Sequence, residues 1–229
     1  MPKPDYRHFL AILENKDEQT APSLFAPFID DTLTEQLIWR RGPQLWDTPE
    51  HYTDTMISLR ERTRADVIIL DSRRFCRTEC SRMLAAAEEH CPDGAAFVVL
   101  CQNPETQRIA ESSPVVCAVG GYEDCCPRTK PFIRMDRTPE EAIAEGAAAW
   151  FAPDHAQEYY NRYHDTLTVA AGLGAPWCAE SEPLAIHRAA EQMMEHTHNQ
   201  GWLLGSGGTI PANAYLSLIS LLGIYGRYR

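Results

Sequence analysis

The chain has 229 residues, of which 44% are hydrophobic and 23% charged, so it has the composition of a folded globular protein without a long disordered segment. Its formal net charge of −11 at pH 7 argues against binding along a nucleic-acid backbone, which needs clustered lysine and arginine side chains. The sequence shows neither the apolar core of a secretory signal nor the roughly 18 consecutive apolar residues of a membrane span, so we expect a cytoplasmic protein without membrane contact.

Short apolar runs recur along the chain and alternate with stretches of helical character. Runs of this length and composition are typical of strands that are buried on both faces of a parallel sheet. A capping residue followed by proline marks three helix starts, at Thr48-Pro49, Asn103-Pro104 and Thr138-Pro139. The predicted strands lie in residues 23–29, 65–70, 95–100, 114–119, 131–135, 147–151, 166–170 and 201–204.

The alternation of strands and helices predicts a single α/β domain over residues 1–229, a compact (β/α)8 TIM-type barrel. Parallel strands need right-handed crossovers, and eight such units close into a barrel that leaves no sheet edge. An open, doubly wound sheet is the alternative. One unit is irregular, because only residues 120–130 join the fourth and fifth strands and the Cys126-Pro127 pair disfavours a helix there.

Active sites in such barrels are built on the loops that follow the strands, so polar side chains at the strand ends are the candidates. Asp71 ends the clearest strand and is the first candidate for catalysis; alternatively, it caps the next helix or pairs with Arg74. Arg134, Asp136 and Arg137 follow the fifth strand. There the two guanidinium groups can bind an acidic substrate, and Asp136 can act in catalysis. Alternatively, the three side chains form a structural ion-pair cluster.

Several loop residues complete the predicted substrate-binding site. The glycine-rich turn after the last strand can bind phosphate or carboxylate oxygens through its backbone N–H groups, or it is a flexible turn that needs glycine. Aromatic, acidic and histidine side chains in the other loops can face the barrel mouth. The candidates are Gly205, Ser206, Gly207 and Gly208 in the turn, and Asp30, His155 and Trp177 in other loops.

The eight cysteines do not form a recognised metal motif. Disulfide frameworks belong to small secreted chains, so we expect these thiols to stay reduced, as in a reducing or anaerobic cell. Cys76 and Cys80 can share a helix face, and His196 and His198 are close in sequence, but neither pair has the ligand spacing of a zinc site. The sequence therefore predicts no metal ligand.

Three segments resemble the uroporphyrinogen decarboxylase superfamily: Phe9-Leu10-Ala11-Ile12-Leu13, the strand end Ile69-Leu70-Asp71 and, most specifically, GWLLGSGGTIP over residues 201–211. The chain is similar to a short, divergent member. The superfamily contains barrels that decarboxylate uroporphyrinogen and zinc-dependent methyltransferases that move methyl groups to or from corrinoids and small thiols. The resemblance implies for Asp71 the role of the aspartate that contacts pyrrole N–H groups and stabilises a cationic intermediate.

The chain departs from this family at functional positions. The decarboxylases carry an arginine-rich segment after the first strand, where this chain has Phe28-Ile29-Asp30-Asp31, whose acids would repel substrate carboxylates. The zinc methyltransferases bind the metal through a His-x-Cys after the fifth strand and a cysteine in the final glycine turn. The aligned positions here are Arg134-Met135-Asp136 and Gly208, so the usual zinc ligands are not found.

These residues and the resemblance lead to three functional hypotheses. The first is a methyltransferase-like enzyme that uses Asp71 and Asp136 on a corrinoid-linked or other small methyl-carrying substrate, with the corrinoid as substrate or on a partner protein. The second is a cofactor-independent decarboxylase of a porphyrinogen-type substrate, in which Asp71 stabilises a cation. The third is a relative without catalytic activity that binds a tetrapyrrole or a partner protein. The resemblance also implies a homodimer.

Overall fold

The computed structural model of the chain describes residues 5–14, 23–25, 31–63, 65–90, 96–126, 129–152, 156–170, 182–198 and 200–205. Eight parallel strands form one sheet in the order β1-β8-β7-β6-β5-β4-β3-β2. The strands are β1 (Leu24–Phe25), β2 (Ile68–Asp71), β3 (Phe97–Cys101), β4 (Val116–Gly121), β5 (Phe132–Arg134), β6 (Ala149–Phe151), β7 (Thr168–Ala170) and β8 (Trp202–Gly205).

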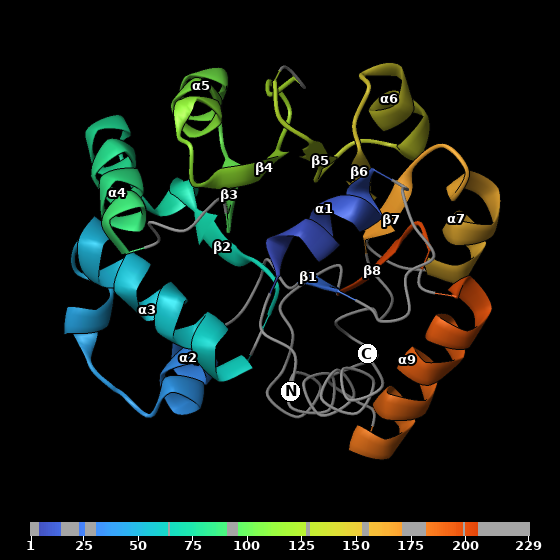
Figure 1. The fold of residues 1–229 in the computed structure, drawn as a ribbon, viewed down its shortest axis with the longest axis horizontal. Helices are drawn as coiled ribbons and strands as arrows, with labels where there is room; N and C mark the ends of the chain where they lie inside the picture. Colours follow the sequence, from blue (N-terminus) through green and yellow to red (C-terminus); the bar gives the residue numbers. More distant parts are fainter. Residues whose placement is uncertain are drawn as a thin grey trace.

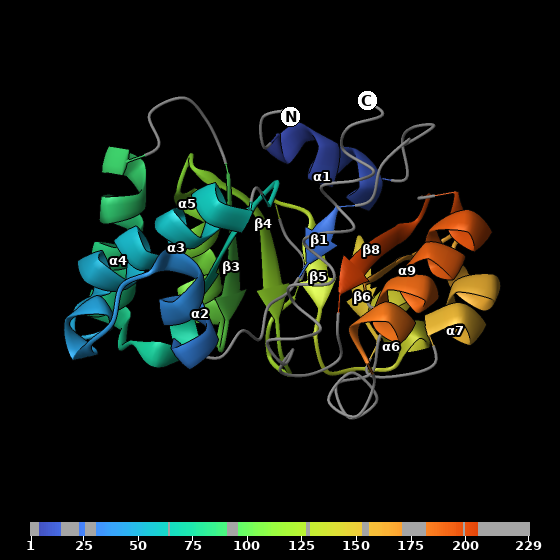
Figure 2. The same ribbon diagram turned by 90° about the horizontal axis from the view of Figure 1, so that it is seen from below.

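Most helices form an outer layer around the curled sheet (Figure 1). Helix α1 differs, because it lies across the inside of the curve, at the end of the sheet where the strands begin (Figure 1 and Figure 2). None of the helices in the described ranges is long and apolar enough to cross a membrane. The helices are α1 (Tyr6–Leu13), α2 (Asp31–Ile38), α3 (Pro49–Thr63), α4 (Arg77–His90), α5 (Pro104–Ser112), α6 (Pro139–Ala144), α7 (Ala156–Tyr163) and α9 (Pro183–Thr197), with short 3-10 turns η1 (Pro43–Leu45) and η2 (Ser72–Arg74).

The strands follow one another around the sheet in chain order, and β1 pairs with β8. This is the order of a TIM-type barrel that is opened between β1 and β2, and it lacks the reversal of strand order that defines a doubly wound sheet. Pairing between β1 and β2 is not among the backbone hydrogen bonds of the described residues. The TIM-like α/β fold is therefore confirmed, and closure into a complete barrel stays a prediction.

Alternate residues of the strands belong to two apolar cores. Leu70 and Val99 point outward and pack in a cluster with apolar residues of the surrounding helices. Leu100 and Ile133 point inward and pack in a second cluster with Phe9 of α1. Because successive strand residues point to opposite faces, this alternation also decides which side chains at the strand ends face the interior.

Polar contacts attach α1 to the sheet. The Asp66 carboxylate lies 2.7 Å from Nδ1 of His8 and accepts a hydrogen bond from the Ser23 hydroxyl at 2.9 Å. Burial alone would raise the pKa of Asp66, but the hydrogen bonds from His8 and Ser23 and the charge of His8 lower it below its ordinary value. The Thr168 hydroxyl of β7 donates to the Ile12 carbonyl at 2.9 Å. Helix α1 thus covers the amino-terminal end of the interior, and the opposite end holds the candidate site.

The connection between β4 and β5 has no helix in its described residues, 122–126 and 129–131, in agreement with the irregular unit that the sequence predicts. The buried Gln107 side chain of α5 accepts a hydrogen bond from the Cys126 backbone N–H at 3.1 Å and donates to the Cys126 carbonyl. Cys125 is buried in the outer core. This loop therefore packs where the other units place a helix.

Two helix starts confirm the predicted capping chemistry. Asn103 accepts a hydrogen bond from the Thr106 backbone N–H at 3.0 Å, and α5 begins with a complete capping box. Thr138 and Glu141 form the reciprocal pair at the start of α6, with N–H to side-chain distances of 3.3 and 3.0 Å. Helix α3 begins at Pro49, where the sequence places it.

Candidate active site at the carboxyl ends of the strands

Asp71 is the last residue of β2 and faces the interior, because Ile68 and Leu70 on the same strand pack outward. Its carboxylate accepts two side-chain hydrogen bonds from Arg73, at 2.8 Å from Nε and 2.7 Å from Nη2. The Arg73 backbone N–H donates a third at 3.0 Å, which caps η2. The capping alternative is thus confirmed, and the paired cation is Arg73 rather than Arg74. The negative charge of Asp71 is thus paired with the positive charge of Arg73.

The backbone at Asp71 is also fixed. Its N–H donates to the hydroxyl of Tyr52 at 2.8 Å, and burial of Tyr52 raises the pKa of that hydroxyl well above its ordinary value. Arg74 pairs with Asp31 of α2 at 3.1 and 2.5 Å, and its guanidinium carbon lies 5.3 Å from the centroid of the Tyr52 ring. These contacts position the end of β2, and with it the direction of the Asp71 side chain.

Tyr122 follows β4 and belongs to the interior cluster, although the sequence analysis did not select it. The guanidinium carbon of Arg73 lies 4.9 Å from its ring centroid, within cation–π distance. Burial raises the pKa of the Tyr122 hydroxyl, the charges of Asp71 and Asp136 raise it further, and the charge of Arg73 lowers it. The hydroxyl oxygen is buried, and its contact with the Arg73 side chain also lowers its pKa. In the sequence, Tyr122 could have been selected because it is an aromatic residue that directly follows two glycines at the end of a predicted strand.

Tightly packed side chains lie in the interior near Tyr122. A Cβ atom on Gly120 would lie 2.7 Å from Cδ2 of Leu100 and 3.5 Å from Sδ of Met135, so only glycine fits without a shift of Leu100. Met135 belongs to the interior cluster and is 8% exposed. The interior at this level is thus apolar and filled, and the polar groups gather at the strand ends.

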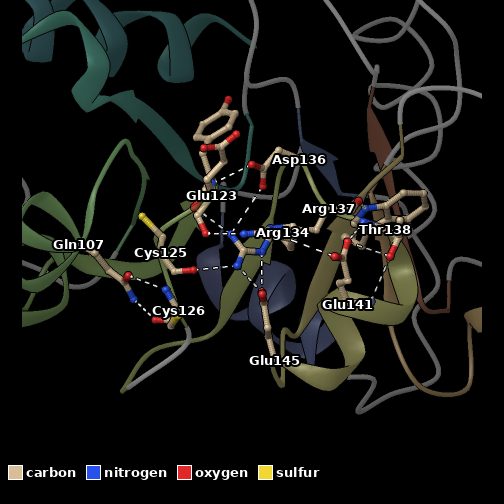
Figure 3. Close-up of polar contacts among 12 residues, drawn as sticks. Gln107, Glu123, Cys125, Cys126, Arg134, Asp136, Arg137, Thr138, Glu141 and Glu145 are labelled. Atoms are coloured by element: carbon tan, nitrogen blue, oxygen red, sulfur yellow. Dashed lines mark hydrogen bonds and ion pairs between the residues drawn. The ribbon is translucent and has the colours of Figure 1, made fainter.

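Asp136 follows β5 and is 22% exposed. Its Oδ2 atom accepts a hydrogen bond from the Glu123 backbone N–H at 2.7 Å, and its Oδ1 atom lies 3.6 Å from Nη1 of Arg134 (Figure 3). Since Asp71 and Asp136 both act on the pKa of Tyr122, the two carboxylates predicted to be catalytic lie near the same phenol. The structure therefore brings together residues from β2 and from the loops after β4 and β5.

Arg134 lies on the outer face of β5, as Phe132 does, and its side chain is fully buried. Its Nε donates to Oε2 of Glu145 at 2.7 Å, and its Nη1 and Nη2 donate to the carbonyls of Tyr122 and Cys125, both at 2.8 Å (Figure 3). These contacts form the structural ion-pair cluster that the sequence left as an alternative. Arg134 binds the β4–β5 loop and α6 from behind the sheet, away from the interior.

Arg137 lies at the start of the turn into α6, and its side chain is 38% exposed. Its Nη2 donates to the Glu123 carbonyl at 3.1 Å, and its Nη1 lies 3.7 Å from Oε1 of Glu141. Its own carbonyl accepts a hydrogen bond from Nε1 of Trp150 at 2.6 Å. Arg137 thus connects the loop after β4 with α6 (Figure 3).

Only one residue of the predicted glycine turn is described. Gly205 is the last residue of β8 and is in register with Phe25 of β1, so it does lie at the carboxyl end of the sheet. The other predicted residues of the loops lie outside the described residues. They are Asp30, His155, Trp177, Ser206, Gly207 and Gly208.

Within the described ranges, no group of three His, Cys, Asp or Glu side chains is arranged to hold a metal ion. The residues at the aligned zinc positions do not form the family's zinc site, because Arg134 is a buried cation that cannot bind the metal, Gly208 has no side-chain donor, and only Asp136 has an oxygen ligand. Burial raises the pKa of the Cys80 thiol to about 11 and that of Cys117 to about 12. These two thiols stay protonated at neutral pH and are poor nucleophiles.

No family model matches the chain, and no curated protein matches it significantly. Among solved structures, a methyltransferase from Methanosarcina mazei aligns with a TM-score of 0.68 over 96% of this chain and 98% of that chain, at 8% sequence identity. An N-acetylneuraminate lyase from Mycoplasma synoviae aligns over 91% of this chain and 79% of that chain at 10% identity, with a TM-score of 0.33 that is too low to inform the fold. The first likeness extends over nearly all of both chains, and it shows that this chain has the TIM-like α/β fold of that methyltransferase.

Proposed function

We propose that this chain is a short, divergent member of the uroporphyrinogen decarboxylase superfamily and a methyltransferase-like enzyme that acts on a corrinoid-linked or other small methyl-carrying substrate. The observation that carries the proposal is the gathering of Asp71, Arg73, Tyr122 and Asp136 at the carboxyl ends of β2, β4 and β5. The full-length fold likeness to a methyltransferase supports it. In this proposal β1 pairs with β2 to close an eight-stranded barrel, and the four side chains line its mouth.

Methyl transfer requires an acceptor placed in line with the methyl donor and a base for the proton that the acceptor loses. A lone pair on the acceptor atom forms the new bond to the methyl carbon. The donor keeps the electron pair of the bond that breaks, so a methylated Co(III) corrinoid becomes Co(I). The proton of the acceptor passes to a carboxylate of the protein and from there to water. No zinc-dependent step is included, because the residues at the family's zinc positions do not fit the metal.

The two carboxylates have different surroundings, and these suggest different roles. Asp71 is held by three hydrogen bonds from Arg73, so it is suited to orienting the Arg73 guanidinium. Asp136 accepts one backbone hydrogen bond and is 22% exposed, so it can take a proton and pass it to solvent. In the proposal Asp136 is the base and Asp71 the electrostatic group. In the proposal, the protein acts as a homodimer. Its binding partners are a small-molecule methyl acceptor and a corrinoid protein.

The test is methyl transfer from methylcobalamin to small thiol and amine acceptors under anaerobic conditions, followed by the visible absorbance change as Co(III)–CH3 becomes Co(I). Asp71→Asn and Asp136→Asn should each lower the rate at least tenfold while the fold is retained. Glu50→Gln is the matched control, because Glu50 is an exposed carboxylate that pairs with Arg82 on the helical surface. It should leave the rate unchanged.

Each outcome of this test decides one part of the proposal. Turnover that Asp71→Asn and Asp136→Asn do not affect would place the active site elsewhere. If the wild-type protein transfers no methyl group from methylcobalamin or from a methylated corrinoid protein, the methyltransferase proposal is wrong. Decarboxylation of a reduced porphyrinogen in a parallel assay would then favour the second hypothesis.

A further inference from the structure

We infer that a surface around Trp39 binds an acidic segment of a partner protein. The Trp39 surface consists of Trp39, Arg40 and Arg41, which follow α2, and of Arg62 at the end of α3. Arg62 lies in the last turn of α3, which leads into β2, so the surface is near the amino-terminal ends of the strands. It is therefore separate from the candidate active site, and the inference goes beyond the proposed function.

Trp39 ends α2 in a backbone conformation that glycine ordinarily takes. Its φ angle is 58°, in the left-handed region. The Trp39 N–H donates to the Gln36 carbonyl at 3.4 Å, and the Arg40 N–H donates to the Glu35 carbonyl at 3.1 Å, which is the hydrogen-bond pattern of a Schellman cap. A Cβ atom is strained at this position, and a bulky side chain is rare there. The helix end thus does not explain the tryptophan, and such strain is typical of functional positions.

Packing does not explain the tryptophan either. The preceding Ile38 is 4% exposed and packs with Leu45 and Leu59 in a small core between α2, η1 and α3. Trp39 is not a member of this core and is 79% exposed. Its indole contacts Arg62, whose guanidinium carbon lies 4.4 Å from the ring centroid, within cation–π distance. Because this contact already orients the indole, less side-chain entropy is lost when a partner covers it.

The cations of the Trp39 surface have no carboxylate partner. Exposed arginines elsewhere on the helices form ion pairs, as Arg77 does with Glu105 at 2.6 Å. Arg40, Arg41 and Arg62 are also exposed, but none of them forms an ion pair within the part of the chain that the structure describes. Their positive charges are thus available to a ligand.

The carboxylates nearest in sequence do not neutralise this surface. Glu35 accepts a hydrogen bond from Nε1 of Trp46 at 3.0 Å, and Glu61 is exposed beside Arg62 in the sequence. The three guanidinium groups of the surface outnumber these two carboxylates, although the whole chain has a formal net charge of −11. A local excess of positive charge next to an exposed indole favours a ligand that carries both carboxylates and apolar groups.

An acidic protein segment fits this surface better than a nucleic acid, a membrane or a second copy of the chain. Tryptophan and arginine are the residues most enriched at the energetic centres of protein–protein interfaces. The net charge of −11 repels nucleic acids and anionic membranes, both of which are bound through larger clusters of cations. A two-fold dimer centred on the Trp39 surface would bring its arginines against the same arginines of the second copy, and like charges repel.

The test follows the indole N–H signal of Trp39 in NMR spectra of the full chain labelled with nitrogen-15, assigned from Trp39→Gly. The probe is a short peptide of alternating glutamate and leucine. The same peptide with glutamine, or with lysine, in place of glutamate is the control. Only the glutamate peptide should shift the Trp39 signal in a saturable way, and its affinity should fall as the salt concentration rises.

Three variants separate binding from stability. Trp39→Gly should weaken peptide binding about tenfold or more, as measured by fluorescence anisotropy of a labelled peptide. Its melting temperature should equal or exceed that of the wild type, because glycine removes the backbone strain. Arg62→Gln should also weaken binding. Arg188→Gln is the matched control, because it removes one exposed arginine from α9, across the fold from α2 and α3 (Figure 1), and it should leave binding unchanged.

Four results would overturn the inference. The first is a Trp39 signal that the glutamate peptide does not shift, or shifts no more than the lysine peptide does. The second is a Trp39→Gly protein that binds the peptide like the wild type. Binding to vesicles of phosphatidylcholine and phosphatidylserine that Trp39→Gly abolishes would assign the surface to a membrane, and loss of a dimer in Trp39→Gly would assign it to a second copy. None of these assays uses a methyl donor, so their results do not depend on the proposed function.

Discussion

Replacement of Arg134 by methionine would remove the centre of the polar cluster behind β5. The side chain is fully buried, and it supplies hydrogen bonds to Glu145 and to the carbonyls of Tyr122 and Cys125. Methionine has a similar length but no donor, so the Cys125 carbonyl and the Glu145 carboxylate lose their hydrogen bonds from Arg134, whereas the Tyr122 carbonyl keeps the one from the Cys125 N–H at 2.8 Å. Each buried group left without a hydrogen bond costs about 1–3 kcal/mol, and breaking a buried ion pair by removing one partner costs about 3–5 kcal/mol.

These contributions overlap and do not add. Glu145 keeps part of its hydration, because its side chain is 28% exposed, so the ion-pair loss lies at the low end of its range. With the Cys125 carbonyl included, we expect Arg134→Met to lower the free energy of unfolding by about 3–5 kcal/mol. With a urea dependence of about 2 kcal/mol per M, the unfolding midpoint would fall by about 2 M.

The assay is urea unfolding followed by tryptophan fluorescence and circular dichroism. Arg137→Met is the control, because Arg137 is 38% exposed and should change stability by less than about 1 kcal/mol. If Arg134→Met unfolds within about 1 kcal/mol of the wild type, the cluster does not hold the β4–β5 loop and our interpretation is wrong.

Three further predictions follow from individual contacts. The pKa of Asp66 is lower in the folded than in the unfolded protein, so ionised Asp66 stabilises the fold above the unfolded-state pKa, and this contribution is lost as the pH falls through the folded-state pKa. Asp66→Asn should therefore lower the urea midpoint at pH 7. The urea midpoint of this variant should also fall less steeply than that of the wild type between about pH 5 and 2. Gly121→Ala places a Cβ atom 2.5 Å from the Phe132 ring and should destabilise the protein by about 1–3 kcal/mol in thermal unfolding, whereas an unchanged melting temperature would contradict this packing. The buried thiols of Cys80 and Cys117, with pKa values of about 11 and about 12, should react with iodoacetamide at pH 7.5 only after unfolding. If mass spectrometry shows that these two thiols in the folded protein are labelled as fast as the exposed Cys76, the prediction is wrong.

Much of the fold can be predicted from local patterns in the sequence. The apolar runs coincide with the strands, and the pairs Asn103-Pro104 and Thr138-Pro139 mark the starts of α5 and α6. These signals are reliable because they arise from chemistry within a few residues: caps satisfy the first backbone N–H groups, and proline at the first helical position loses no hydrogen bond. The short β4–β5 connection follows in the same way from the length and composition of the segment.

The direction of each side chain at the strand ends could not be predicted. A strand that is buried on both faces shows no alternation of apolar and polar residues, so the sequence does not tell which of its residues point inward. Arg134 and Asp136 were expected to act together, but they differ in environment: Arg134 is fully buried in the outer layer, and Asp136 is partly exposed beside the Glu123 N–H. Tyr122 was missed because its importance comes from Arg73 and Asp71, more than 45 residues away in the sequence.

The hydrogen bond from the Thr168 hydroxyl to the Ile12 carbonyl joins residues that are 156 positions apart. During synthesis, α1 leaves the ribosome long before β7, so the surface against which it packs does not yet exist. Closing so long a loop is slow, and Phe9 and its apolar neighbours stay exposed while they wait. We therefore expect the docking of α1 to be a late step of folding, and the nascent chain to depend on chaperones that shield apolar segments during translation.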